Sequence, residues 1–250
     1  MALMRTSNPA LNRNSFQAEG IGIGEQMTLS GTVNKTGILV VCAVAAAAWT
    51  WNLFTHAPSA DTVLPLTAIG LIGGFIVAMV TIFKKSWAPV TAPIYALLEG
   101  LVLGSLSAML ELRYPGIAMQ AVGLTFGTLL AMLIAYRSGV IRATDNFKLG
   151  VVAATGGIAL FYVVTMVLSF FGLHLFGSVF SAGPIGIGFS VFVVIIAALN
   201  LVLDFDFIEA GARLGSPKYM EWYGAFGLMV TLIWLYFEIL RLLVKLRGRK

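Results

Sequence analysis

Seven stretches of about 20 residues, each almost free of charged side chains, run along the sequence and constrain its fold more than any other feature. An α-helix of that length crosses the ~30 Å hydrocarbon core of a bilayer, because each residue adds about 1.5 Å. Strands of an outer-membrane barrel would alternate polar and apolar residues over about ten residues, and these stretches do not alternate. The predicted spans are Thr36–Phe54, Thr62–Phe83, Ala88–Leu110, Ile117–Tyr136, Leu149–Gly172, Ile185–Leu203 and Trp222–Val244.

Composition agrees with an integral membrane protein. Of the 250 residues, 59% are hydrophobic and 11% are charged, whereas about a quarter of the residues of a soluble domain are charged. With so few charges, the folded surface needs lipid as part of its solvent. We therefore predict an all-α, polytopic seven-helix bundle over residues 35–250, preceded by a tail at residues 1–34.

The single cysteine and the placement of positive charge exclude further classes of protein. Cys42 lies inside an apolar stretch, so neither an intrachain disulfide framework nor a cysteine-based zinc site is available. The net charge is +5, but the Lys and Arg residues form short clusters between spans instead of one basic stripe. We expect membrane lipids and cations as partners, leave other membrane proteins open, and expect no nucleic acid.

The distribution of Lys and Arg predicts the orientation, because positive residues favour cytoplasmic loops. The tail and the loops after even-numbered spans carry most of them, and the other inter-span loops carry Arg113. This pattern predicts a multi-pass inner-membrane protein with a cytoplasmic N-terminus. The C-terminal cluster opposes it, so either a segment re-enters without crossing, or the earlier loops set the orientation and the cluster is tolerated. The cluster comprises Arg241, Lys245, Arg247, Arg249 and Lys250.

Glycines recur four residues apart in two predicted spans, as Gly100 with Gly104 and Gly123 with Gly127. Small residues at this spacing let two helix backbones approach closely, so we expect tight helix packing at both pairs. Pro184 is expected in the first turn of the sixth span, where its missing N–H costs nothing.

Glu99 lies inside the third span, about 16 Å from the start of that span and near the middle of the membrane. We expect no local partner for its carboxyl group. An ionisable residue at this depth is costly and by default marks a functional site, here an ion or proton pathway. The alternative is a neutral, hydrogen-bonded Glu that only ties helices together.

A second group of acids, Asp204, Asp206 and Glu209, follows the sixth span. Residues two apart on a helix are rotated by about 200°, so Asp204 and Asp206 do not face one lumen. Asp204 shares its face with Asn200, which predicts Asp204 as the carboxylate at the mouth of a pathway and Asn200 as a neutral oxygen ligand. Asp204 and Asp206 are also candidate metal ligands, because carboxylate oxygens bind Ca²⁺. The alternative for these acids is an ordinary solvated helix end.

In the last span, Glu238 precedes Arg241 by three residues, a spacing that allows an ion pair on the helix. Glu238 lies about 24 Å beyond Trp222, so it is expected near the membrane face opposite Asp204. A snorkelling pair at the membrane edge is one interpretation, and a place in an ion pathway is the other.

Catalytic patterns are not apparent. The two histidines, His56 and His174, lie in or beside loops after odd-numbered spans, away from any deep serine nucleophile. Every lysine lies at the end of a span or outside it, which excludes a retinal Schiff base. We expect no enzyme and no resident cofactor, with Ca²⁺ as a transient ligand.

Short motifs along the whole chain, taken in their order and spacing, resemble the Bax inhibitor family, and more closely its bacterial YccA-type branch. These motifs are Met4-Arg5-Thr6-Ser7-Asn8-Pro9, Glu99-Gly100 with Gly104, Asp204 with Ile208, and Leu240-Arg241-Leu242 at the end of an aromatic last span.

The resemblance implies a pH-sensitive Ca²⁺ leak pathway, in which helices pack around a central last span and a pair of aspartates in the last two helices controls conduction. Asp204 matches the first aspartate, and Thr231 stands where the second would be. Lys84 and Lys85 are the rough counterparts of an arginine latch that follows the second helix in the family.

Because Thr231 replaces an acid, a rearranged pathway that uses Glu99, Asp204 and Glu238 is a further hypothesis. Functions from other classes also stay open. One is a non-conducting membrane scaffold that binds partner proteins, such as a regulator of membrane proteolysis, and another is a proton-coupled transporter.

Overall fold

The computed structural model describes residues 25–56, 60–173 and 177–248, and within these ranges it contains helices and no strand. Seven of the described helices are long and apolar enough to cross a membrane, which confirms the predicted all-α fold with seven spans. The motif Met4–Pro9, His174 and the last two residues lie outside the described residues. The helices are α2 (Leu29–His56), α3 (Ala60–Phe83), η2 (Lys85–Trp87), α4 (Ala88–Arg113), α5 (Ile117–Arg137), α6 (Asp145–Phe170), α7 (Gly177–Phe180), α8 (Pro184–Arg213) and α9 (Met220–Arg247).

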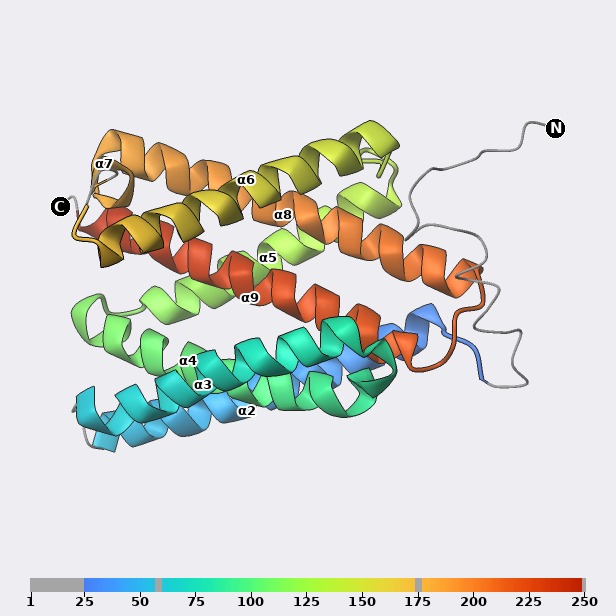
Figure 1. Ribbon diagram of the computed structural model, residues 1–250, viewed down its shortest axis with the longest axis horizontal. Coiled ribbons are helices and arrows are strands. Elements are labelled where there is room, and N and C mark those ends of the chain that lie inside the picture. Colours follow the sequence, from blue (N-terminus) through green and yellow to red (C-terminus); the bar gives the residue numbers. More distant parts are fainter. Residues whose placement is uncertain (1–24, 57–59, 174–176, 249–250) are drawn as a thin grey trace.

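Successive long helices run in opposite directions, so their connections gather at two ends of the bundle (Figure 1). The end that holds the start of α2, the η2 turn and the α8–α9 link is called the tail end below, and the opposite end is called the far end. α9 runs without interruption from the tail end to the far end (Figure 1). The two termini of the described chain therefore lie at opposite ends of the bundle.

The chemistry at helix ends explains several boundaries. Thr144 caps α6, because its Oγ1 accepts the N–H of Phe147 at 3.3 Å. Pro184 occupies the first turn of α8, as predicted. Gly215 closes the turn after α8 with φ +65°, a conformation that costs glycine little.

The helices extend beyond the predicted spans. α8 continues past Leu203 to Arg213, so the acids from Asp204 to Glu209 belong to the helix itself. α2 begins at Leu29, and the residues just before it pair with the α8–α9 link. The membrane interface does not end a helix, because the N–H and C=O groups of the backbone pair within the helix itself and do not need lipid around them.

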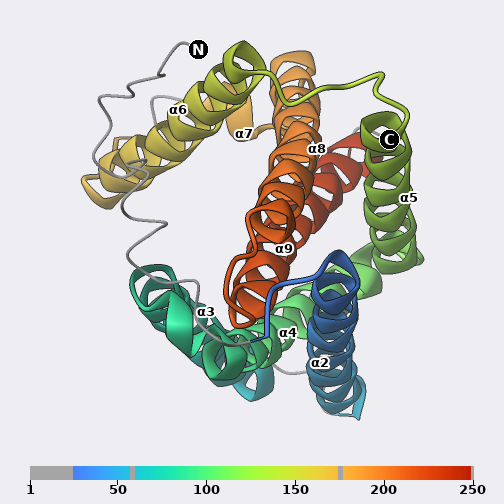
Figure 2. The same cartoon turned by 90° about the vertical axis from the view of Figure 1, so that its right-hand side faces the viewer.

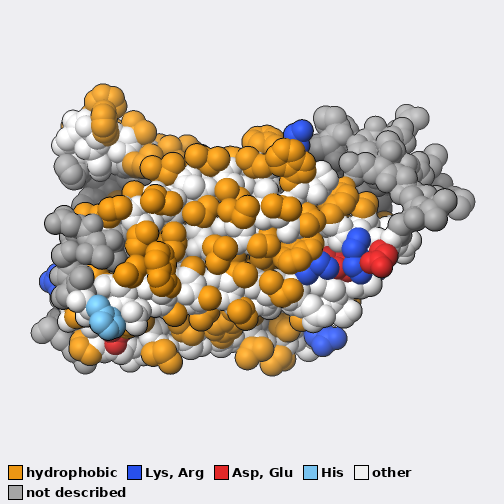
Figure 3. Space-filling model, turned by 90° about the horizontal axis from the view of Figure 1, so that it is seen from below, with side chains coloured by type: hydrophobic (Ala, Val, Ile, Leu, Met, Phe, Trp, Pro, Cys, Tyr) orange, Lys and Arg blue, Asp and Glu red, His pale blue; other side chains and the backbone are white. Residues whose placement is uncertain are grey.

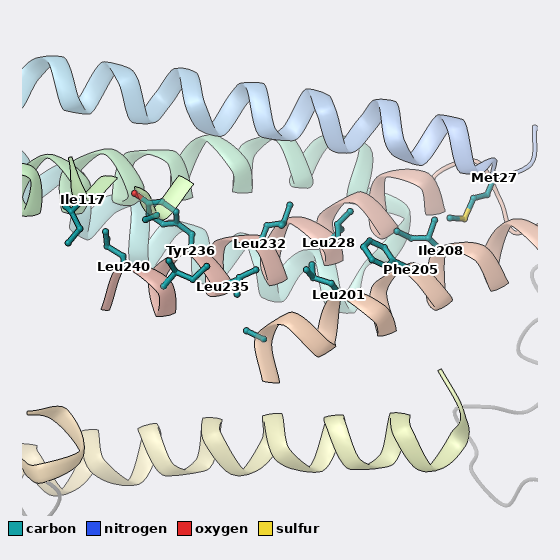
Figure 4. Packing of buried hydrophobic residues seen from close by; sticks show 13 residues of the cluster. Met27, Ile117, Leu201, Phe205, Ile208, Leu228, Leu232, Leu235, Tyr236 and Leu240 are labelled. Carbon is teal, nitrogen blue, oxygen red and sulfur yellow. The ribbon is translucent and has the colours of Figure 1, made fainter. Parts of the chain in front are cut away.

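α9 packs against α2, α4, α5 and α8, and it has the largest buried share of the seven long helices. On one side, Leu201 and Phe205 of α8 share a core cluster with Leu232 and Leu235 of α9 (Figure 4). On the other side, α2 and α4 supply a second cluster around Phe226 of α9.

The two glycine pairs behave differently. A Cβ at Gly100 or Gly104 would overlap the carbonyl oxygen of Ala43 or Ala47 on α2, so close packing is confirmed for this pair. A Cβ at Gly123 or Gly127 would meet nothing within 4 Å. The prediction of close packing at the second pair is wrong, because those glycines lie on an exposed face of α5.

The outer surface of the bundle matches a lipid environment. Hydrophobic side chains spread over the length of the face in Figure 3, while the coloured charged groups gather toward the ends. Figure 2 shows α6 lying apart from α2 and α4, with α8 and α9 between. The packed contacts of α6 are made with α8.

Candidate functional site

Asp204 of α8 faces α9. Its carboxylate interacts with the hydroxyl of Thr231, and its Oδ1 lies 4.0 Å from the position of a Cβ at Gly227, one turn earlier on α9. The Oδ2 atom is shielded from solvent and has no hydrogen-bond partner in the described part of the chain. Buried polar atoms are nearly always paired, so this oxygen marks a site that needs an explanation.

Asn200, one turn from Asp204, is committed to holding α6. Its Nδ2 donates to Thr155 Oγ1 of α6 and to the Ile196 carbonyl oxygen, both at 2.8 Å. The amide therefore uses both of its donor hydrogens within the bundle. Asn200 therefore lies between α6 and α8. Asp204 is one turn further along α8.

The other acids of α8 pair with different helices. Asp206 Oδ2 lies 2.5 Å from Lys148 Nζ at the start of α6. Glu209 accepts a hydrogen bond from the Tyr136 hydroxyl of α5 and pairs with Arg213. Within the described ranges, no cluster of three or more His, Cys, Asp or Glu side chains could hold a metal ion. Asp204 differs from these two acids, because it faces α9 and has no cationic partner in the described ranges.

Glu99 lies between α4 and α3, and its environment corrects one expectation. The Tyr95 side chain, one turn earlier, forms a hydrogen bond with it, so the prediction of no local partner is wrong. A Cβ at Gly74 of α3 would lie 3.0 Å from Glu99 Oε1, so this glycine makes room for the carboxylate. Tyr95 also packs edge-on against Phe226 of α9, with 5.0 Å between ring centroids. Glu99 is therefore connected to α9 through Tyr95.

Glu238 forms the ion pair that its spacing predicted, at the far end of the bundle. Arg241 Nη1 lies 3.1 Å from each Glu238 carboxylate oxygen, and the Tyr162 hydroxyl of α6 donates to Oε1 at 3.1 Å. The Arg241 guanidinium also lies over the Tyr162 ring. Glu238 is 2% exposed, so the pair is buried on the carboxylate side and ties α9 to α6.

Neighbouring C-terminal cations are also held by the protein. Lys245 is buried and donates to the carbonyl oxygens of Val179 and Gly186 and to Ser190 Oγ, at 2.8 to 2.9 Å. Arg247 donates to the Pro115 carbonyl oxygen and to Gln120 Oε1. Of the C-terminal cluster, the three described cations, Arg241, Lys245 and Arg247, thus have partners within the bundle.

Lys84 and Lys85 lie at the tail end and contact aromatic rings. Lys84 Nζ is 5.6 Å from the Trp87 ring centroid, and Lys85 Nζ is 5.5 Å from that of Tyr223 on α9. Neither lysine forms an ion pair with a residue in the described ranges. The pair thus lies beside the start of α9, where Lys85 makes a cation–π contact.

The sequence reasoning missed Glu221, which is completely buried at the start of α9. Its Oε1 accepts the Thr28 N–H at 2.8 Å and the Thr28 hydroxyl at 2.9 Å, and its Oε2 pairs with Lys35 of α2. Lys218 Nζ lies 3.3 Å from Oε1, and this contact raises the pKa of Lys218 above its ordinary value of 10.5.

The chain before α2 is clamped beside this buried acid. Gln26 forms an isolated antiparallel bridge with Pro217, and the Met27 N–H donates to the Ser216 carbonyl oxygen at 2.7 Å. The sequence signal available was weak, because only the spacing from Lys218 to Glu221 suggested a local pair. Thr28 and Lys35 are 193 and 186 residues away from Glu221 in the chain.

The comparisons with known proteins agree with this architecture. A family model described as Bax inhibitor 1 like matches residues 8–248, a region that includes all seven long helices. Comparisons with curated proteins and with solved structures gave no significant match. With a match over nearly its whole length, the chain belongs to the Bax inhibitor family and is an integral, multi-pass helical membrane protein.

Proposed function

We propose that the protein is a pH-sensitive leak pathway for cations, chiefly Ca²⁺, in the inner membrane, with the tail end in the cytoplasm. The observation that carries this proposal is the Asp204 carboxylate, which lies within α8, faces α9 and has an unpaired, buried oxygen. An acid at such a place is costly to keep, and in membrane proteins it usually serves an ion or a proton.

The neighbours of Asp204 support this role. Its two fellow acids on α8 are already neutralised by Lys148 and Arg213, so Asp204 is the carboxylate that remains for a cation or a proton. A cation that leaves water needs oxygen ligands to replace its hydration shell, and a carboxylate lowers that barrier most. Proton binding removes the charge, so one group links conduction to pH.

Glu99 is the second acid assigned to the pathway. It lies on the other side of α9, next to α3, and its contact with Tyr95 places a phenol between the carboxylate and Phe226. Glu238 has a different role, because Arg241 and Tyr162 occupy its oxygens. We assign Asp204 and Glu99 to conduction and Glu238 to helix association.

The proposal is tested by flux measurements in vesicles that contain a Ca²⁺-sensitive dye. Asp204→Asn should change the Ca²⁺ flux and flatten its pH dependence, because the amide cannot exchange a proton in this range. Asp206→Asn is the matched control on the same helix, and its flux should follow the wild type. A well-folded Asp204→Asn protein with normal flux and a normal pH response would refute the proposal.

The main alternative is a non-conducting scaffold, such as a regulator of membrane proteolysis. It is favoured by Glu221 and Glu238, because both acids join helices through buried ion pairs. Under that alternative, Asp204→Asn changes the thermal stability of the protein, and vesicles with and without the protein show equal Ca²⁺ flux.

A further inference from the structure

An apolar cavity of about 430 Å³ lies between α2 and α5, away from the acids assigned to conduction. Both helices pack against α4 and α9, which form the floor of the cavity. In Figure 2, α2 and α5 stand apart in the right-hand half of the molecule. The volume is within the range of about 300–1,000 Å³ that is typical of ligand pockets.

The polar groups in the cavity wall are already satisfied by the protein. The Ser107 and Tyr236 hydroxyls lie 2.6 Å apart, and Thr125 donates to the Ala121 carbonyl oxygen at 2.8 Å. The two oxygens of Glu111 accept the N–H groups of Gly116 and Ala118. Water fills a cavity only where polar partners are free, and at about 30 Å³ per water this cavity would need many such partners. The cavity therefore favours an apolar ligand, such as a hydrocarbon chain, over water.

The cavity is open to the lipid-facing surface. Val44 of α2 and Met119 and Val122 of α5 line it, and these side chains are 59%, 75% and 39% exposed. Since the outer faces of both helices lie in the bilayer, these rim residues are continuous with the surface that lipid covers. A lipid chain can enter sideways without leaving hydrocarbon.

The position of the cavity along the membrane matches one leaflet. On α2 it extends from Val40 to Trp51, which is about 16 Å along the helix axis. Half of a ~30 Å hydrocarbon core is about 15 Å. Trp51 and Ala118 lie toward the far end of the bundle, and Val40 lies near the middle of α2. The cavity thus spans the leaflet on the far side.

The far end also offers positive charge to a phosphate group. Arg113, the last residue of α4, is exposed at the far end and lies over the Tyr114 ring at 5.7 Å. Arg247 is tied to the start of α5 at the same end. Such residues at a membrane interface attract the phosphate of a lipid headgroup.

We propose that this cavity binds one acyl chain of a bilayer phospholipid from the far leaflet, with the chain terminus near Val40 and the phosphate at the far interface, where Arg113 and Arg247 lie. The inference is independent of the proposed ion pathway. A bound chain fills the space between α2 and α5 and supports the packing of both helices on α4 and α9.

The test uses the full chain in phospholipid vesicles that contain a trace of phospholipid with a photoactivatable diazirine on one acyl chain. After irradiation, peptide mass spectrometry locates the label. We expect more label on Ala47, Val44 and Met119 than on Leu71 and Ile72, which are exposed apolar residues of α3 and serve as the internal standard. Equal labelling of cavity residues and standard residues would overturn the proposal.

A matched pair of variants tests the site. Ala48 and Ala45 are both exposed on α2, but Ala48 lines the cavity and Ala45 does not. Ala48→Phe should remove most of the label from the cavity residues, and Ala45→Phe should leave it unchanged. Both variants should keep the label on Leu71 and Ile72. Cavity label that survives in a folded Ala48→Phe protein would overturn the proposal. If that protein does not fold, Met119→Trp at the exposed rim is the substitute.

The position of the diazirine along the chain tests the direction of binding. A diazirine near the chain terminus should label Val40 and Met229, and one near the ester should label Trp51 and Met119. The opposite order would show that the chain enters from the other leaflet and would overturn the assignment.

Discussion

Thr231 on α9 lies against Asp204 on α8, at the position where the family resemblance places a second acid. The site therefore has the geometry of a carboxylate pair with a hydroxyl in place of one carboxylate. A substitution that restores an acid at Thr231 therefore tests whether this position controls conduction.

Thr231→Asp should spread the pH dependence of Ca²⁺ flux over a wider pH range than in the wild type. Two carboxyl groups in contact bind protons as a coupled pair, so they titrate in two linked steps. The flux is measured in dye-loaded vesicles over a series of pH values. Thr231→Asn is the control of nearly equal size, and the same profile in both variants would contradict the expectation.

Glu99→Gln should lower cation flux more than Glu238→Gln does. The Gln side chain can keep the contact with Tyr95, so Glu99→Gln should remain folded and lose only the charge. Glu238→Gln leaves Arg241 without its buried partner, so it should mainly lower the melting temperature in detergent. A larger loss of flux in a stable Glu238→Gln protein would move the pathway toward the end of α9.

Glu221→Gln should destabilise the tail end of the bundle by about 3 kcal/mol, because it leaves the largely buried Lys35 without its carboxylate partner. The loss is measured by thermal unfolding and by faster amide exchange at Met27 and Thr28. Glu25→Gln is the control, since the 82% exposed Glu25 side chain contacts Lys218 at 3.5 Å and should contribute little. Equal effects of the two changes would show that Glu221 is not the anchor.

Lys218 should give a small alkaline loss of stability. Its pKa is raised in the folded protein by Glu221, so its contribution is complete below the ordinary pKa of 10.5 and disappears as the pH rises through the higher folded value. Lys218→Met should remove this part of the pH dependence in unfolding experiments. A Lys218→Met protein with the same alkaline profile as the wild type would contradict the expectation.

Gly104→Ala should destabilise the protein by about 1–3 kcal/mol, because the new methyl group would overlap the Ala47 backbone of α2. Gly123→Ala should leave stability unchanged or raise it by up to about 1 kcal/mol, since alanine favours a helix and the site is open. Thermal unfolding of the two variants in the same detergent gives the comparison. A similar melting temperature for both would show that the α2–α4 contact adapts.

The candidate site was predictable only in part. The sequence singled out Asp204, Glu99 and the Glu238–Arg241 pair, because ionisable residues are rare inside apolar stretches. It did not identify Glu221, whose partners Thr28 and Lys35 are distant in the chain. Nor did the sequence show that Asp206 has a cationic partner, because that partner, Lys148, comes from another helix.

By itself, the sequence determined the number of spans and the helical class, because a chain in lipid must satisfy its backbone hydrogen bonds internally and about 20 apolar residues cross the core. Only the tertiary structure decided which face of each helix is buried. The glycine pairs of α4 and α5 have the same spacing, yet one pair contacts α2 and the other faces outward. The physical reason is that lipid and protein interior are both apolar, so a membrane helix is hydrophobic on all sides and its sequence pattern does not mark the inner face.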